Sequence, residues 1–89
     1  MATFYSTKQF KIGERAIGGI IKVDFEKNLV TVSALDYYSK KEICSKKFWL
    51  SGYDVEYDVE LYLDELSTSY HASKIMEYIK TKVTFNQQF

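Results

Sequence analysis

The sequence has no proline, a single cysteine and a single histidine among its 89 residues. With Cys44 alone the chain cannot form an intrachain disulfide, which is typical of proteins in a reducing compartment. One thiol and one imidazole, that of His71, also fall short of the three or four ligands that a zinc site requires. No motif pairs His71 with a nucleophile and an acid. We therefore expect no metal, no cofactor and no catalytic residue.

Long apolar runs and phosphate-binding loops are missing as well. No segment approaches the roughly 20 apolar residues of a membrane span, and the first residues lack the apolar core of a secretion signal. Gly13, Gly18 and Gly19 do not have the spacing of a nucleotide-binding loop, so we assign them to turns or bulges. These absences predict a cytoplasmic protein that is not an enzyme and makes no contact with membranes.

The chain is rich in aromatic residues, with 8 Tyr, 6 Phe and 1 Trp. Hydrophobic residues make up 46% of it, which is enough for the core of a single domain over residues 1–89. The net charge is zero, and this disfavours general binding to nucleic acid. The charge is uneven, however, because residues 54–66 contain six acidic residues and no basic one.

A period-2 pattern predicts a β-hairpin in the first half of the chain. Apolar residues alternate with polar ones on both sides of residues 27–28, at Ile21, Val23, Phe25, Val30, Val32 and Ala34. A two-residue turn at Lys27 and Asn28 places all six on one face, as a buried sheet face requires. Shorter strands are expected around residues 4–5 and 10–12.

The same parity predicts two further strands. Cys44, Phe48 and Leu50 point inward from a strand over residues 40–50, with Lys46 as an exception. A turn at residues 51–52 then leads into a strand over residues 54–66, whose inner face contains Val55, Tyr57, Val59, Leu61 and Leu63. Both segments also fit helices, because residues 39–42 resemble a capping box and residues 55–66 carry apolar residues at helical spacing. We favour strands because one register links them.

Residues 69–83 are predicted to form a helix, because Ala72, Ile75, Met76, Ile79 and Val83 recur at helical spacing. Hydroxyl groups at residues 67–69 offer an N-cap. The predicted fold class is therefore α+β: an antiparallel meander of four or five strands, twisted or closed like an SH3 barrel, packed by one C-terminal α-helix. Residues 1–66 are mainly β, residues 67–83 form the helix and residues 84–89 form a tail.

The acidic segment is the first candidate site. Asp54, Glu56, Asp58 and Glu60 alternate with Tyr and Val, so a strand would present the carboxylates in one row. Such a row keeps an edge strand soluble, and it also suits a partner protein with a basic surface. We expect this row to bind a partner.

Apolar residues on the outer side of the predicted sheet are the second candidate. The hairpin register places Ile20 opposite Leu35, and Ile43 and Trp49 share the outer parity. A one-sided sheet would show polar residues there, so something should cover these four. The N-terminal segment, a second copy in a homodimer, or a partner protein anchored on Trp49 would serve.

Our functional hypothesis is a small, non-enzymatic protein-interaction module, an inhibitor or adaptor of the kind found among phage and mobile-element accessory proteins. The alternative hypothesis is a nucleic-acid-binding domain. It rests on basic residues near stacking aromatics in and around the hairpin from Lys40 to Trp49. These residues are Lys40, Lys41, Lys46, Lys47, Tyr37 and Tyr38.

Overall fold

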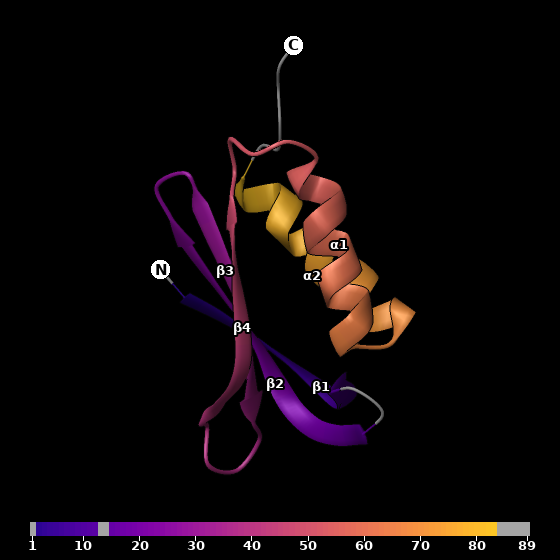
Figure 1. Cartoon of the computed structure of the whole chain (residues 1–89). Helices are drawn as coiled ribbons and strands as arrows, with labels where there is room; N and C mark the ends of the chain where they lie inside the picture. Colours follow the sequence, from indigo (N-terminus) through magenta and orange to yellow (C-terminus); the bar gives the residue numbers. More distant parts are fainter. Residues whose placement is uncertain (1, 13–14, 84–89) are drawn as a thin grey trace.

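The computed structural model of the chain describes residues 2–12 and 15–83. It contains the elements β1 (Ala2–Ile12), β2 (Arg15–Glu26), β3 (Leu29–Asp36), β4 (Glu42–Trp49), α1 (Val55–Leu66) and α2 (Ser69–Lys82). The strands form an antiparallel sheet in the order β1-β2-β3-β4. Both helices lie on the same side of this sheet (Figure 1). The predicted α+β class with an antiparallel sheet is confirmed.

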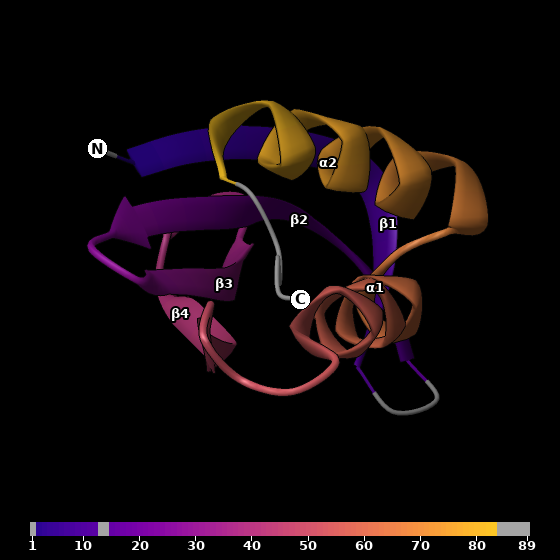
Figure 2. The same ribbon diagram turned by 90° about the horizontal axis from the view of Figure 1, so that it is seen from above.

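The sheet is strongly curved and has two open edges. Figure 2 shows it bending around the helices, and α1 contacts both edge strands, β1 and β4. Among the described residues β1 and β4 are not hydrogen-bonded to each other, so the strands do not close into the barrel that we considered from the sequence. The helices fill the concave side that such a closure would have enclosed.

The β2–β3 hairpin has the register that the period-2 pattern predicts. Phe25 is opposite Val30, Val23 opposite Val32, and Ile21 opposite Ala34. The turn falls at residues 27–28, where Asn28 adopts a left-handed φ of 61°. Asn tolerates this conformation better than most residues with a side chain.

Residues 42–49 form a strand, which confirms the strand prediction for this segment and excludes the capping-box helix. Phe48 is opposite Val30 and Cys44 is opposite Ala34. The register shifts by one residue between Ala34 and Leu35, so that Ile43 is the extra residue of a bulge. The bulge changes the parity only at the beginning of β4.

Residues 55–66 form a helix, so the prediction of a strand here, and of a single helix in the chain, was wrong. Four residues of α1 at helical spacing are buried: Val55, Val59, Leu63 and Leu66. A helix buries this set on one side, whereas a strand would divide it between two faces. Glu56 therefore lies on a helix and not on a strand beside β4.

The turn at residues 51–52 leads into a helix and not into a strand. The left-handed residue is Asp54, the N-cap of α1, with φ 58°. Gly52 is needed for space: a Cβ there would lie 3.0 Å from Val55 Cγ2 and 3.1 Å from the carbonyl oxygen of Trp49. The chain therefore leaves β4 through a compact connection that starts a helix.

Helix α2 confirms the predicted C-terminal helix. The side chain of Thr68 caps it by accepting a hydrogen bond from the backbone N–H of His71 at 3.4 Å. Lys80 and Lys82 lie in its last turn, where the helix dipole favours cations. The predicted tail, residues 84–89, lies outside the described residues.

The N-terminal segment is one long strand in place of two short ones. β1 pairs with β2 along residues 2–12, with a register shift between Thr7 and Phe10. Gly18 and Gly19 belong to β2 and form no turn, although the shift in β1 lies beside them. The turn expected at Gly13 lies outside the described residues.

The hydrophobic core lies between the sheet and the two helices. The inward residues of β2, β3 and β4 pack against the buried sides of α1 and α2. The largest fully buried side chains are Ile21, Leu63, Ile75, Ile79, Val23, Val30, Val32 and Val59. The opposite face of the sheet, which we call the outer face, and the exposed side of α1 remain available for contacts.

Candidate functional site

The exposed side of α1 carries large apolar residues. Tyr57 is 55% exposed and Leu61 is 43% exposed, and residues four apart lie on the same side of a helix. Tyr53, four residues before Tyr57, is 94% exposed. Tyr53 precedes the N-cap Asp54 and lies outside the helix. We call Tyr57 and Leu61 the α1 stripe. Its position is opposite the buried residues of the helix, so intramolecular packing does not require it.

Carboxylates flank the α1 stripe. At 100° per residue, Asp58 and Glu65 fall on one side of it, and Glu60 and Asp64 fall on the other. All four are exposed. Within the described residues, no ion pair involves any of them. The α1 stripe is therefore an apolar strip between two acidic borders.

The helix divides the acidic residues that the sequence placed in one row. Asp54 caps the helix without a side-chain hydrogen bond. Asp58 lies one turn further along, on one border of the α1 stripe. Glu56 lies on the side facing α2, where its carboxylate is 2.8 Å from the Lys80 ammonium. The hydrogen bond and charge of Glu56 raise the pKa of Lys80. Glu56 is thus committed to the helix pair, while Asp58 and Glu60 face solvent.

The acidic borders work against the stability of α1. Helix α1 contains no basic residue in its last turn, although carboxylates there oppose the helix dipole. Asp64 and Glu65 occupy this region, and Glu60 and Asp64 form a like-charge pair four residues apart, which is unfavourable by about 0.2–0.5 kcal/mol. Helix stability therefore does not account for these charges.

The outer face does not unite the four apolar residues expected there. Ile20 and Leu35 are cross-strand neighbours, as predicted, but each is only 7% exposed. Ile43 and Trp49 are exposed, yet they lie near opposite ends of β4. β1 extends the sheet beside β2 and so does not form a layer over the outer face. The two exposed residues, Ile43 and Trp49, are therefore separate, and they do not form one patch.

The residues of the nucleic-acid hypothesis are also separated. Lys46 and Lys47 are adjacent in β4, so their side chains point to opposite faces. Tyr37, Tyr38, Lys40 and Lys41 belong to the β3–β4 loop. The structure thus brings Lys40 and Tyr37 together, with the ammonium 5.4 Å from the ring centroid, but it does not join them to both lysines of β4.

The β3–β4 loop is held by Asp36. Its carboxylate accepts hydrogen bonds from the backbone N–H of Ser39 at 2.8 Å and of Tyr38 at 3.1 Å. These bonds, that from Ser39 first, lower the pKa of Asp36. Lys40 completes the loop in the left-handed region, with φ 63°, and its ammonium donates to the Tyr37 carbonyl at 2.8 Å.

The α1 stripe was missed because the strand register assigned Tyr57 and Leu61 to the inner face. The signal that finds it is the spacing of Tyr57 and Leu61, which share the period of the buried set but are shifted by two residues from it. An amphipathic helix with a second, polar-bordered apolar strip has this pattern.

His71 and the other potential ligands make no metal site in residues 2–12 and 15–83, where no group of three or more His, Cys, Asp or Glu side chains could hold an ion. Neither helix is long and apolar enough to cross a membrane. No family model, curated protein or solved structure matches the chain. The candidate site therefore has to be inferred from the geometry of the α+β domain, and the α1 stripe is the main candidate.

Proposed function

We propose that the protein is a non-enzymatic protein-interaction module that binds a basic partner through the α1 stripe. The observation that carries the proposal is the combination of an exposed apolar strip with acidic borders that lack basic partners within the described residues. A partner with an apolar centre and flanking Lys or Arg residues would cover the strip and neutralise both borders. The free thiol of Cys44 suits a reducing compartment.

The acidic borders favour a partner over a purely structural role. Charges kept at a cost to the helix indicate selection for something other than stability, as at many binding surfaces. Tyr is a suitable residue for such a surface, because it buries a large ring and keeps a hydroxyl for hydrogen bonds. An amphipathic basic helix lying along α1 would present its own apolar residues at the spacing of the stripe.

The proposal can be tested with a basic amphipathic peptide that carries Leu or Trp at every third or fourth position between Lys and Arg. We expect binding that weakens at least fivefold between 50 and 300 mM salt, because screening reduces the contribution of the exposed charges. An acidic peptide with the same apolar residues should not bind. Isothermal titration calorimetry measures both affinities.

Two variants separate a specific surface from general attraction of cations. The double variant Tyr57→Ala and Leu61→Ser keeps every charge, and we expect it to weaken peptide binding at least tenfold. Neutralising both acids of the last turn, Asp64→Asn with Glu65→Gln, should weaken binding while raising the melting temperature. The matched control, Glu26→Gln with Glu77→Gln, removes two exposed carboxylates elsewhere and should leave binding unchanged. Equal binding by the Tyr57/Leu61 variant would reject the proposal.

A further inference from the structure

The strand β4 has one open edge. It is the last strand of the sheet, and among the described residues it pairs only with β3. In Figure 1 this edge faces the viewer, and no other labelled element crosses it between the two ends of the strand. Of the eight residues of β4 only Phe48 is buried. The β4 edge is therefore accessible both in its backbone and in most of its side chains.

The backbone groups on the β4 edge can be assigned from the hydrogen bonding on the β3 side. The Leu50 N–H donates to the Asn28 carbonyl at 3.0 Å, so this residue directs its backbone groups towards β3. The direction alternates from residue to residue in an antiparallel pair. Ser45, Lys47 and Trp49 therefore direct their N–H and C=O groups away from β3. These outward groups can form the ladder of a further antiparallel strand.

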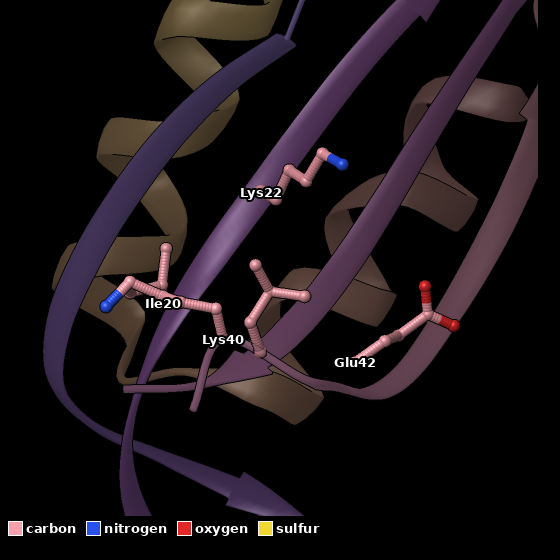
Figure 3. Close-up of a pocket in the computed structure, with 5 residues that line it drawn as sticks. Ile20, Lys22, Lys40 and Glu42 are labelled. Atoms are coloured by element: carbon pink, nitrogen blue, oxygen red, sulfur yellow. The ribbon is translucent and has the colours of Figure 1, made fainter. Parts of the chain in front are cut away.

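The charges of β4 are divided between its two halves. Glu42 is its first residue, and Lys46 and Lys47 lie in its second half. In Figure 3 the side chain of Glu42 extends away from Lys22 and Lys40. Within the part of the chain that the structure describes, neither Glu42 nor Lys47 belongs to an ion pair. An antiparallel second copy would bring the acidic end of each strand to the basic half of the other.

Glu65 of α1 adds a second carboxylate at the acidic end of β4. Burial, the hydrogen bond to Cys44, and then the charges of Glu65 and Glu42 raise the pKa of Tyr62. Both carboxylates are therefore near the Tyr62 hydroxyl, which is 3.5 Å from Cys44 Sγ. A cation that approaches Cys44 along the β4 edge meets this acidic group.

We propose that two copies of this chain pair antiparallel through their β4 edges, about a two-fold axis at Ser45, so that one sheet continues across both copies. In this register Lys47 is opposite the bulge that Glu42 and Ile43 form in the second copy. The contact occurs twice, because a two-fold interface is isologous. Trp49 lies two residues beyond Lys47, so it becomes a diagonal neighbour of the second copy's Ile43. The α1 stripe faces away from the sheet and stays exposed, so this interface is distinct from the one under the proposed function.

The lysines of β4 select the register centred on Ser45. A centre at Lys46 or Lys47 would place two identical cations directly opposite each other, which is unfavourable in a sheet. A centre at Cys44 would bring Lys47 to the basic β3–β4 loop of the second copy. Lysines on an edge strand discourage indiscriminate pairing, and of these four centres they leave Ser45. There Lys46 is opposite the second copy's Cys44, beside the acidic end that Glu65 extends.

Sedimentation equilibrium of the full chain, from micromolar to millimolar concentration, tests the pairing. We expect a monomer–dimer equilibrium with a dissociation constant in the micromolar range. Lys47→Glu and Glu42→Lys each turn two attractive contacts into repulsive ones and should weaken the dimer about tenfold or more. The double variant restores opposite charges and should return to within about threefold of the unaltered protein. Lys27→Glu, in the β2–β3 turn, is the matched control and should change nothing. A monomer at millimolar concentration, or a double variant as weak as the single ones, would overturn the proposal.

Disulfide cross-linking tests the register. In a Cys44→Ser background, Ser45→Cys places two thiols at the two-fold axis, where the Cα separation of paired strands suits a disulfide. Oxidised glutathione should link these copies much faster than the exposed control Lys27→Cys in the same background, and equal rates would overturn the proposal. The variant Tyr57→Ala with Leu61→Ser should leave the dimer intact. Loss of the dimer in that variant would place the interface on the α1 stripe and would also overturn the proposal.

Discussion

The ammonium of Lys46 lies 5.7 Å from the ring centroid of Tyr62, which joins β4 to α1. The same ammonium is 5.7 Å from the ring centroid of Phe48. Lys46 has the inward parity of β4, but it is at an edge strand, where a long side chain can reach solvent. Its charge therefore rests on two aromatic faces at the border of the core, which explains the basic residue in an otherwise apolar pattern.

Lys46→Met should leave the stability almost unchanged. The variant loses a cation–π contribution of about 0.5–1 kcal/mol, and the thioether gains contacts of similar size with the two rings. Lys46→Glu should lower the free energy of unfolding by about 1 kcal/mol, because the attraction is lost and the negative ring faces repel the carboxylate. Urea denaturation of the three proteins measures the difference. Equal destabilisation by Met and Glu would show that only the stem of Lys46 matters.

Tyr62 predicts how stability changes at alkaline pH. Burial, followed by the hydrogen bond that its hydroxyl donates to Cys44 Sγ at 3.5 Å, raises the pKa of Tyr62. The folded protein keeps this proton at a pH where the unfolded chain, with a tyrosine pKa of about 10, has lost it. The stabilisation is complete below about pH 10 and is lost as the pH rises further towards the folded pKa.

Tyr62→Phe should therefore make the decline of stability between about pH 10 and 12 shallower. The free energy of unfolding is measured by urea denaturation at several pH values in this range. Tyr57→Phe, a change at an exposed ring of the same helix, should keep the decline of the unaltered protein. A Tyr62→Phe curve parallel to the unaltered one would contradict the assignment.

Asn28 joins two turns that are far apart in the sequence. Its side-chain amide donates to Ser51 Oγ at 3.2 Å, and its carbonyl accepts from the Leu50 N–H at 3.0 Å. Because Asn28 has a φ of 61°, Asn28→Ala should lower the free energy of unfolding by about 1 kcal/mol. Asn28→Gly should stay within about 0.5 kcal/mol of the unaltered protein, since Gly tolerates this φ. Chemical denaturation distinguishes the two, and equal losses would assign the effect to the amide instead.

The β2–β3–β4 meander could be predicted from the sequence because its signals are local and agree with one another. Alternation in Ile21, Val23 and Phe25 matches alternation across a two-residue turn, and a shift by one residue would expose the whole set. The outer pair of Ile20 and Leu35 followed from the same register. The burial of this pair could not be predicted from the register. The methylene groups of Lys40 reach the pair from the β3–β4 loop, and the conformation of a loop has no periodic signal in the sequence.

Helix α1 could not be predicted with the same certainty because its sequence satisfies two periods. Val55 and Val59 are four residues apart, which fits both a strand and a helix, and only Tyr62 and Leu66 break the strand parity. The outcome depends on the chain that precedes it, since the connection at Gly52 and the left-handed Asp54 direct the segment over the sheet rather than beside β4. That choice also decided whether Tyr57 and Leu61 would be buried or would form the α1 stripe.

Gly52 is the residue on which this connection depends most directly. A Cβ at position 52 would be 3.0 Å from Val55 Cγ2 and 3.1 Å from the Trp49 carbonyl oxygen, and the backbone N–H of Gly52 is bonded to that same carbonyl at 2.9 Å. Crowding of this kind costs about 1–3 kcal/mol, and the reduced freedom of the unfolded chain returns about 0.4–1 kcal/mol. Gly52→Ala should lower the free energy of unfolding by about 1 kcal/mol, or the melting temperature by about 4–8 °C.

A double-mutant cycle with Val55→Ala tests the cause of this loss. Val55→Ala removes Cγ2 at the start of α1, so the added Cβ should be less unfavourable in that background, by about 0.5 kcal/mol or more. Thermal unfolding of the four proteins gives the coupling, and Val59→Ala, one turn further along α1, is the matched background that should show none. If Gly52→Ala lost the same stability in all three backgrounds, the Val55 contact would not be the reason for glycine. The steric origin of the turn, and with it the explanation for a helix where alternation predicts a strand, would then have to lie in the Trp49 carbonyl alone.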